Sequence, residues 1–245
     1  SMGVPRPDGF FGNCDPKNKK NYRTRCSALI TFNKKNILID TSPDLRSQLL
    51  SQKVTTIDGV LYTHCHADQT HGINDLRIFY LKKNKRIPIY CDKITSKYLT
   101  KNFSYCFVRK YDYPAILILK PFKKNFSLGE KGKIIHIKAI KVRHGSIDSI
   151  GYIINNKIAY ISDANSFYKR DYDCFKDLKY LIIDCLRFNK HSSHFNLEDV
   201  LRITKSLEPK KTILTNLHSD LDYNQLLKML PNNIKPGYDG LSINI

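Results

Sequence analysis

Residues 60–72 constrain the fold and chemistry of this chain more than any other segment. An apolar run over residues 60–62 is typical of a buried strand, and His64, His66 and Asp68 follow it, spaced two apart. Alternate residues of an extended segment point to the same side, so both imidazoles can face one point. Two imidazoles and a carboxylate are suitable ligands for Zn²⁺, Mn²⁺ or Fe²⁺. The alternative is a polar turn with incidental histidines, but ligand-type residues so closely spaced after a buried strand favour a metal site.

Other residues of the ligand type also follow predicted strands. His144 comes after an alternating segment, Asp163 ends an apolar run, and His218 follows another apolar run. His191 and His194 share a polar loop. Loops at strand ends hold functional groups in place because the strand behind them is rigid. We therefore expect these side chains and the first histidine pair to gather at one edge of a single sheet.

Short apolar runs alternate with helical patterns along the chain, and no repeat, low-complexity tract or linker divides it. Residues 1–245 are predicted to form one α/β domain, in which layered sheets are covered by helices. The predicted strands cover residues 28–32, 37–40, 59–63, 87–91, 116–120, 134–142, 150–154, 157–162, 180–184, 212–215 and 241–245. The predicted helices cover residues 44–51, 74–83, 95–102, 196–206 and 223–230, with Asn196 as an N-cap.

Residues 63–69, Thr-His-Cys-His-Ala-Asp-Gln, resemble the His-x-His-x-Asp-His signature of the metallo-β-lactamase superfamily. The flanking segments are similar to the PhnP-like phosphodiesterase branch, and they keep the same order along nearly the whole chain. These segments are residues 3–5, 15–18, 38–41, 43–46, 72–77, 160–163, 186–194, 214–218 and 238–241. The resemblance implies a four-layer αββα sandwich, the metallo-β-lactamase fold, and a metal-dependent hydrolase. One scaffold of this kind hosts many reactions, so the substrate does not follow from it.

The resemblance also implies a ligand set for two divalent ions, Zn²⁺ or Mn²⁺. One ion would be held by His64, His66 and His144, and the other by Asp68, Gln69 and His218, with Asp163 bridging the two. Asp68 and His194 would have catalytic roles. Asp40, Asp44 and Asp75 are interpreted as groups that orient the ligating imidazoles, although each could equally be a helix cap.

Gln69 departs from the family pattern, which has histidine at this position. An amide oxygen is a weaker and harder donor than an imidazole, so we expect the second ion to bind less tightly and to favour Mn²⁺, Mg²⁺ or Fe²⁺ over Zn²⁺. His71, two residues further on, is a less favoured substitute ligand.

Seven scattered cysteines without a Cys-x-x-Cys pair argue against a disulfide framework and for a reducing compartment. No apolar run reaches the roughly 18 residues that cross a bilayer, so a cytoplasmic location and no membrane partner are expected. PhnP-like enzymes can hold a structural zinc on a cysteine cluster near the start of the chain. Here only Cys14 lies in that stretch, with Cys26 further on, so no such zinc is expected.

The formal charge of +19 bears on the partner of this chain. Clustered lysine and arginine attract phosphates, but even spreading of lysine also follows from biased composition, and no arginine-rich helix stands out. The predicted function is a phosphodiesterase that uses a metal-activated hydroxide on a phosphodiester or another small anionic substrate. The alternatives are a β-lactamase, a ribonuclease with RNA as partner, or a non-catalytic metal-binding protein with a degraded second site. A homodimer is possible, and the sequence leaves the oligomeric state open.

Overall fold

The computed structural model describes residues 2–130 and 133–244, and the chain divides into two compact units. Unit 1 comprises Ser1–Thr24, Lys124–Leu128 and Ile135–Ile245, and unit 2 comprises Arg25–Lys123 and Gly129–Ile134. Each unit is built around its own sheet and its own hydrophobic core.

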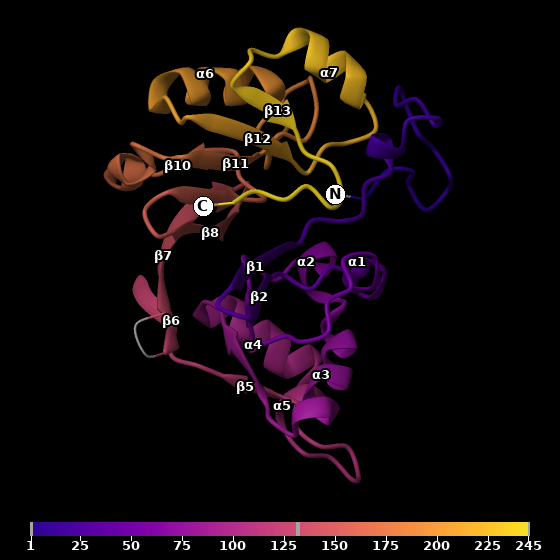
Figure 1. Cartoon of the computed structure of the whole chain (residues 1–245), viewed down its shortest axis with the longest axis vertical. Coiled ribbons are helices and arrows are strands. Elements are labelled where there is room, and N and C mark those ends of the chain that lie inside the picture. The colour runs from indigo at the N-terminus through magenta and orange to yellow at the C-terminus, as the bar shows by residue number, and fades with distance from the viewer. Residues whose placement is uncertain (1, 131–132, 245) are drawn as a thin grey trace. The chain divides into compact units, whose positions relative to one another are not determined.

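The sheet of unit 2 has the order β1-β2-β3-β4-β5 (Figure 1). Its strands are β1 (Ala28–Phe32), β2 (Lys35–Ile39), β3 (Gly59–Leu61), β4 (Ile87–Tyr90) and β5 (Leu117–Leu119). The first two form an antiparallel hairpin through Asn33 and Lys34, which both have positive φ, as a two-residue hairpin turn with the right-handed sheet twist requires. The other strands pair in parallel, so their carboxyl ends lie on one edge.

Short helices connect the strands of unit 2 and cover its sheet. They are α1 (Leu45–Ser51), α2 (Ala67–Thr70), η2 (Ile73–Leu76), α3 (Arg77–Lys83), α4 (Lys93–Asn102) and α5 (Ser104–Phe107). Asp92 caps α4 by accepting a hydrogen bond from the Thr95 backbone N–H at 2.8 Å. The core between helices and sheet contains Leu45, Leu76 and Leu99, all completely buried.

The sheet of unit 1 has the order β10-β7-β8-β9-β11-β12-β13, and β6 pairs with β7 outside this path. Its strands are β6 (Asn125–Glu130), β7 (Lys133–His144), β8 (Ile147–Ile154), β9 (Ile158–Ile161), β10 (Ser166–Phe167), β11 (Tyr180–Asp184), β12 (Lys211–Thr215) and β13 (Ile234–Pro236). Strands β7, β8 and β9 are antiparallel neighbours, whereas β9, β11, β12 and β13 are parallel. The remaining elements are η1 (Lys19–Asn21), η3 (Lys169–Phe175), α6 (Leu197–Leu207) and α7 (Tyr223–Met229).

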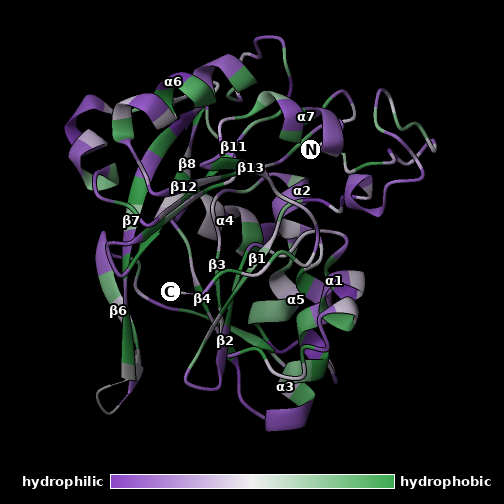
Figure 2. Ribbon diagram, turned by 45° about the horizontal axis from the view of Figure 1, so that its top comes forward, coloured by the Kyte–Doolittle hydropathy of each residue, from purple (hydrophilic) through white to green (hydrophobic). Residues whose placement is uncertain are grey.

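Helix α6 shows why the sequence folds in this way. Asn196 caps it by accepting from the Asp199 backbone N–H, as predicted. Its buried residues Leu197, Val200, Ile203 and Leu207 recur at helical spacing and pack into the core of unit 1. Each such side chain stabilises the fold by about 1.5–3 kcal/mol when fully buried. In Figure 2, α6 carries both hydrophobic (green) and hydrophilic (purple) residues, as expected for a helix with one buried face.

The structure corrects several predictions. A strand over residues 241–245 is wrong for the described residues 241–244, because Leu241 donates to the Tyr238 carbonyl in a turn, and residue 245 lies outside them. The last strand is β13, which its short length and Pro236 concealed. The predicted helix 74–83 is split into η2 and α3. No helix among the described residues is long and apolar enough to cross a membrane.

Candidate metal centre

The histidine-rich loop of unit 2 begins where β3 ends and is fixed from behind by a buried carboxylate. Asp40, completely buried with φ +62°, accepts hydrogen bonds from the backbone N–H and the hydroxyl of Thr63, both at 2.8 Å. The Thr63 Oγ1 lies 3.0 Å from Nδ1 of His64, which is itself 2% exposed. Asp40 therefore orients the first histidine through Thr63, and the role of that ring as a metal ligand stays a prediction.

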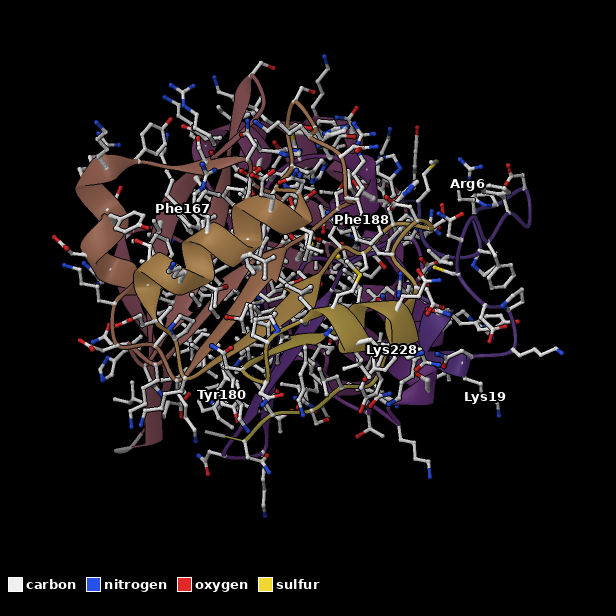
Figure 3. The ribbon with its side chains drawn as sticks, turned by 90° about the horizontal axis from the view of Figure 1, so that it is seen from above. Arg6, Lys19, Phe167, Tyr180, Phe188 and Lys228 are labelled. Atoms are coloured by element: carbon white, nitrogen blue, oxygen red, sulfur yellow. The ribbon has the colours of Figure 1, made fainter. Side chains whose placement is uncertain are left out.

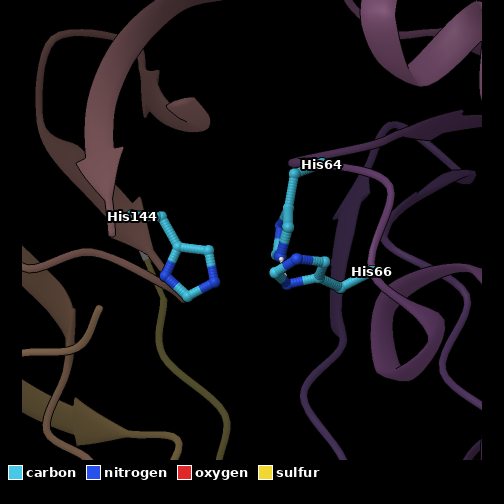
Figure 4. A group of neighbouring side chains, drawn as sticks. All are labelled: His64, His66 and His144. Atoms are coloured by element: carbon cyan, nitrogen blue, oxygen red, sulfur yellow. Dashed lines mark hydrogen bonds between the residues drawn. The ribbon is translucent and has the colours of Figure 1, made fainter. Parts of the chain in front are cut away.

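The imidazoles of His64 and His66 converge, as the spacing of two residues predicts. Nε2 of His64 lies 3.0 Å from Nδ1 of His66, and the ring centroids are 4.5 Å apart (Figure 4). Two ring nitrogens that face one point, one on a buried ring and one on an exposed ring, fit a cation reached from solvent.

The short helix α2 carries the next two predicted ligands. Asp68 is half-buried in its first turn, and the side chain of Gln69 is completely buried. The Gln69 carbonyl accepts from the Thr41 backbone N–H at 2.8 Å, which ties α2 to the segment after β2. His71 instead contacts the hydroxyl of Tyr98 at 3.1 Å and the ring of Phe103.

Unit 1 contains its own cluster of ligand-type side chains. His144 ends β7, Asp163 follows β9, and His194 lies in the loop before α6, and their ligand atoms all lie within 4.8 Å of one another. Nδ1 of His144 lies 2.7 Å from the Ser193 carbonyl, which can only accept, so Nε2 carries the lone pair of the neutral ring. An imidazole fixed in this way, next to a buried carboxylate, fits a divalent cation such as Zn²⁺ or Mn²⁺.

Asp184, at the end of β11, supports this cluster from behind. Its Oδ2 accepts from Nδ1 of His194 at 2.7 Å and from the Ala164 backbone N–H at 3.0 Å. Complete burial raises the pKa of Asp184 to about 6, although the hydrogen bond from His194 opposes this shift. Burial of His194 acts to lower its pKa, but the hydrogen bond and charge of Asp184 outweigh it, and the pKa of His194 is raised.

Asn216, which follows β12, joins these groups from the neighbouring strand. Its Nδ2 lies 3.2 Å from Oδ1 of Asp184, 3.5 Å from Oδ1 of Asp163 and 3.2 Å from the Ser162 carbonyl. The backbone has φ +60° here, a conformation that asparagine tolerates better than most residues. Asp184 and Asn216 were missed as site residues, although both follow the same pattern of a polar residue closing an apolar strand.

His218 and His191 lie at the margin of the cluster. The His218 ring is 24% exposed, and its Nδ1 lies 3.4 Å from the Ser219 hydroxyl and 3.7 Å from a carboxylate oxygen of Asp220. The His191 ring lies 5.1 Å from that of His194, and burial together with the charge of His194 lowers its pKa. Neither belongs to a compact ligand group among the described residues.

Two of the predicted placements are wrong. The predicted ligands do not share one sheet: His64 and His66 follow a strand of the unit 2 sheet, whereas His144, Asp163 and His218 follow strands of the unit 1 sheet. The reason is that β3 pairs with β2 and β4, which sequence alone could not reveal. Asp44 is paired with Arg25, at 2.6 Å, and not with an imidazole; it occupies the N-cap position of α1, the alternative predicted for it, without a capping hydrogen bond from its side chain.

The sequence profile of the β-lactamase superfamily domain matches residues 35–216, which include both histidine-bearing loops. The chain therefore belongs to the metallo-β-lactamase superfamily, whose members are metal-dependent hydrolases. Within it the chain is PhnP-like: a solved diphosphatase from the PhnP family is 28% identical, with a TM-score of 0.86 over 98% of this chain and 91% of that chain. The predicted family and fold are confirmed.

Two further comparisons are more limited. The short form of human tRNase Z has a TM-score of 0.69 over 96% of this chain and 97% of that chain, and at 16% identity it shows the common fold alone. A relative from Porphyromonas gingivalis (strain ATCC BAA-308 / W83), named octanoyltransferase, is 30% identical over 245 residues. The alignment covers 98% of this chain and 49% of that protein, so the chain spans about half the length of this relative.

Proposed function

We propose that this chain is a phosphodiesterase that also accepts diphosphates, acting with two bound divalent ions. The observation that carries the proposal is the 28% identity, over nearly all of both chains, to a diphosphatase of the PhnP family. The formal charge of +19 is compatible with an anionic substrate, since it raises the local concentration of phosphates.

The ligand set proposed for these ions is the one that the family resemblance implies. His64, His66 and His144 would hold one ion, and Asp68, Gln69 and His218 the other, with Asp163 shared between them. When bound, such ions supply a water molecule of lowered pKa as nucleophile and neutralise charge on the phosphoryl oxygens. The two convergent imidazoles of unit 2 and the ligand group of unit 1 each support this assignment.

His194 is proposed to move the proton that the leaving group needs. Its Nδ1 is held by Asp184, so Nε2 is the nitrogen that faces away from this carboxylate and can donate. Asp184 stabilises the charged ring of His194 and fixes its orientation. Asn216 contacts the carboxylates of both Asp184 and Asp163 and keeps them in place relative to each other. The catalytic role of Asp68 stays a proposal that rests on the family resemblance.

Replacing Asp184 by asparagine should lower kcat about ten- to hundredfold with little change in KM, because Asp184 acts on the orientation and charge of His194 and not on substrate. The measurement is steady-state kinetics on a phosphodiester. Asp171→Asn is the matched control: Asp171 is also a buried aspartate of unit 1, but its partners are Lys124 and Arg170. Equal losses in the two variants would contradict the assigned role.

The relative named octanoyltransferase favours a second candidate, hydrolysis or transfer of an octanoyl group. Cleavage of a β-lactam or of RNA is a further reaction that the same scaffold could host. One substrate panel separates them: bis(p-nitrophenyl) phosphate, a dinucleoside diphosphate, a single-stranded RNA, a chromogenic β-lactam and p-nitrophenyl octanoate.

We expect turnover of the first two compounds, its loss after chelation, and its return with Mn²⁺ or Zn²⁺. Metal content measured on the same protein should approach two ions per chain. Activity on the octanoyl ester alone would replace the proposed function, and no bound metal after purification with metal present would favour a non-catalytic protein.

A further inference from the structure

Residues 12–23 of unit 1 lie against the turn formed by residues 218–221, although the two segments are about two hundred residues apart in sequence. Figure 3 shows the N-terminal segment, marked by Arg6 and Lys19, next to α7. His218, the first residue of the turn, is the ligand proposed above. We call residues 12–23 the N-terminal clasp.

The clasp holds the turn through a buried arginine. Arg23, 8% exposed, donates from Nη1 to the His218 carbonyl at 3.2 Å and from Nη2 to the Leu221 carbonyl at 2.7 Å. The same guanidinium donates to Oδ1 of Asn21 at 3.1 Å and contacts Sγ of Cys14 at 3.8 Å. One planar guanidinium therefore holds both ends of the turn through two different nitrogens, a preorganised geometry that a flexible ammonium lacks.

A close backbone approach holds the middle of the turn. The Asn13 N–H donates to the Ser219 carbonyl at 2.8 Å. Gly12 has φ +59°, and a Cβ at this position would lie 2.4 Å from the same carbonyl oxygen. Only glycine permits this approach without displacing the turn.

A second layer of polar contacts keeps the clasp in place. Nδ2 of Asn21, which is completely buried, donates to Oδ2 of Asp222 at 2.6 Å, and its Oδ1 accepts from the Tyr223 backbone N–H at 2.9 Å. The Asp15 backbone N–H donates to the same carboxylate at 3.1 Å. The clasp and the start of α7 are thus one connected network.

We propose that the N-terminal clasp positions His218 as a metal ligand, with Arg23 as its principal positioning residue; this rests on the proposed function, in which His218 binds the second ion. The contacts of the ring itself are long, 3.4 Å to Ser219 and 3.7 Å to Asp220. The position of the ring therefore depends on the backbone that carries it, and the clasp holds that backbone from the His218 carbonyl to the Leu221 carbonyl. A ligand held in advance binds its ion more tightly, because less freedom is lost on binding.

The test is a Co²⁺ titration of the metal-free full chain, followed by the visible absorption bands that report the coordination of each ion. Arg23→Met should weaken the binding of the second equivalent of Co²⁺ about ten- to hundredfold and alter the absorption bands of that ion. Binding of the first equivalent should stay as in wild type. Arg23→Lys, which keeps the charge but has one nitrogen to share between the two carbonyls, should weaken it less. Gly12→Ala, which displaces the Ser219 carbonyl, gives an independent disturbance of the same turn.

Two controls make the outcomes decisive. Leu207→Ala in α6 destabilises the core of unit 1 but does not alter a residue of the turn. It should therefore leave the binding of both equivalents of Co²⁺ unchanged. His218→Ala reports on the ligand itself. If His218→Ala weakens the second equivalent but neither Arg23 variant nor Gly12→Ala does, the clasp proposal is overturned and the proposed function stands. If His218→Ala binds cobalt like wild type, the proposed ligand set fails, and the clasp proposal with it.

Discussion

His64→Ala and His66→Ala should each lower phosphodiester turnover on the order of a thousandfold, the largest functional effect expected in this chain. Each removes one of two imidazole nitrogens that lie 3.0 Å apart and face the same point. A cation held by fewer ligands binds weakly and no longer has its intended geometry. The loss should therefore appear both in kcat/KM and in the metal content of the purified protein.

His136→Ala is the matched control for this experiment. His136 is an exposed histidine on β7 whose Nδ1 lies 3.0 Å from the Ser127 hydroxyl, and no metal role is assigned to it. Its removal should change neither activity nor metal content. Wild-type turnover in His64→Ala would remove this loop from the mechanism, whatever the control shows.

Gly72→Ala should destabilise the chain by about 3 kcal/mol or more, the largest stability effect expected from a single methyl group. A Cβ at this position would lie 1.9 Å from the Ser42 carbonyl oxygen and 2.9 Å from Cβ of Leu45. Backbone has to move to relieve such a clash, since the atom it meets is not the end of a flexible side chain. For a chain of this length the midpoint of thermal unfolding should fall by roughly 10 °C.

The displacement caused by a side chain at Gly72 should also reach the histidine-rich loop of unit 2. Its N–H donates to the Thr41 carbonyl at 2.9 Å, and the Thr41 N–H donates to the Gln69 carbonyl at 2.8 Å. A displaced Gly72 therefore displaces α2, so metal affinity should fall with stability. Gly9→Ala is the control that separates a steric clash from backbone strain. Gly9 has φ +81°, so alanine is strained there, but its Cβ would have nothing within 4 Å. Equal unfolding midpoints for Gly72→Ala and wild type would show that the segment after β2 yields easily.

Local patterns predicted much of the fold. The strands β1 and β11 have the predicted bounds, and α6 begins after its predicted cap, because each depends on hydrophobic periodicity and a nearby polar stop. Pairing between distant strands could not be predicted in this way, and the assignment of all ligands to one sheet failed for that reason. Asp184 closes an apolar strand as the predicted ligands do, but its role became evident only from its contact with His194.

The contacts of Arg23 also bear on how the chain matures. Arg23 and the His218 carbonyl that it holds are separated by 195 positions, so these partners meet only after the long segment between them has been synthesised. Contacts of such long range close late and slow the approach to the native state. The turn that contains His218 is thus expected to become ordered late in folding, after the segments that rely on local contacts.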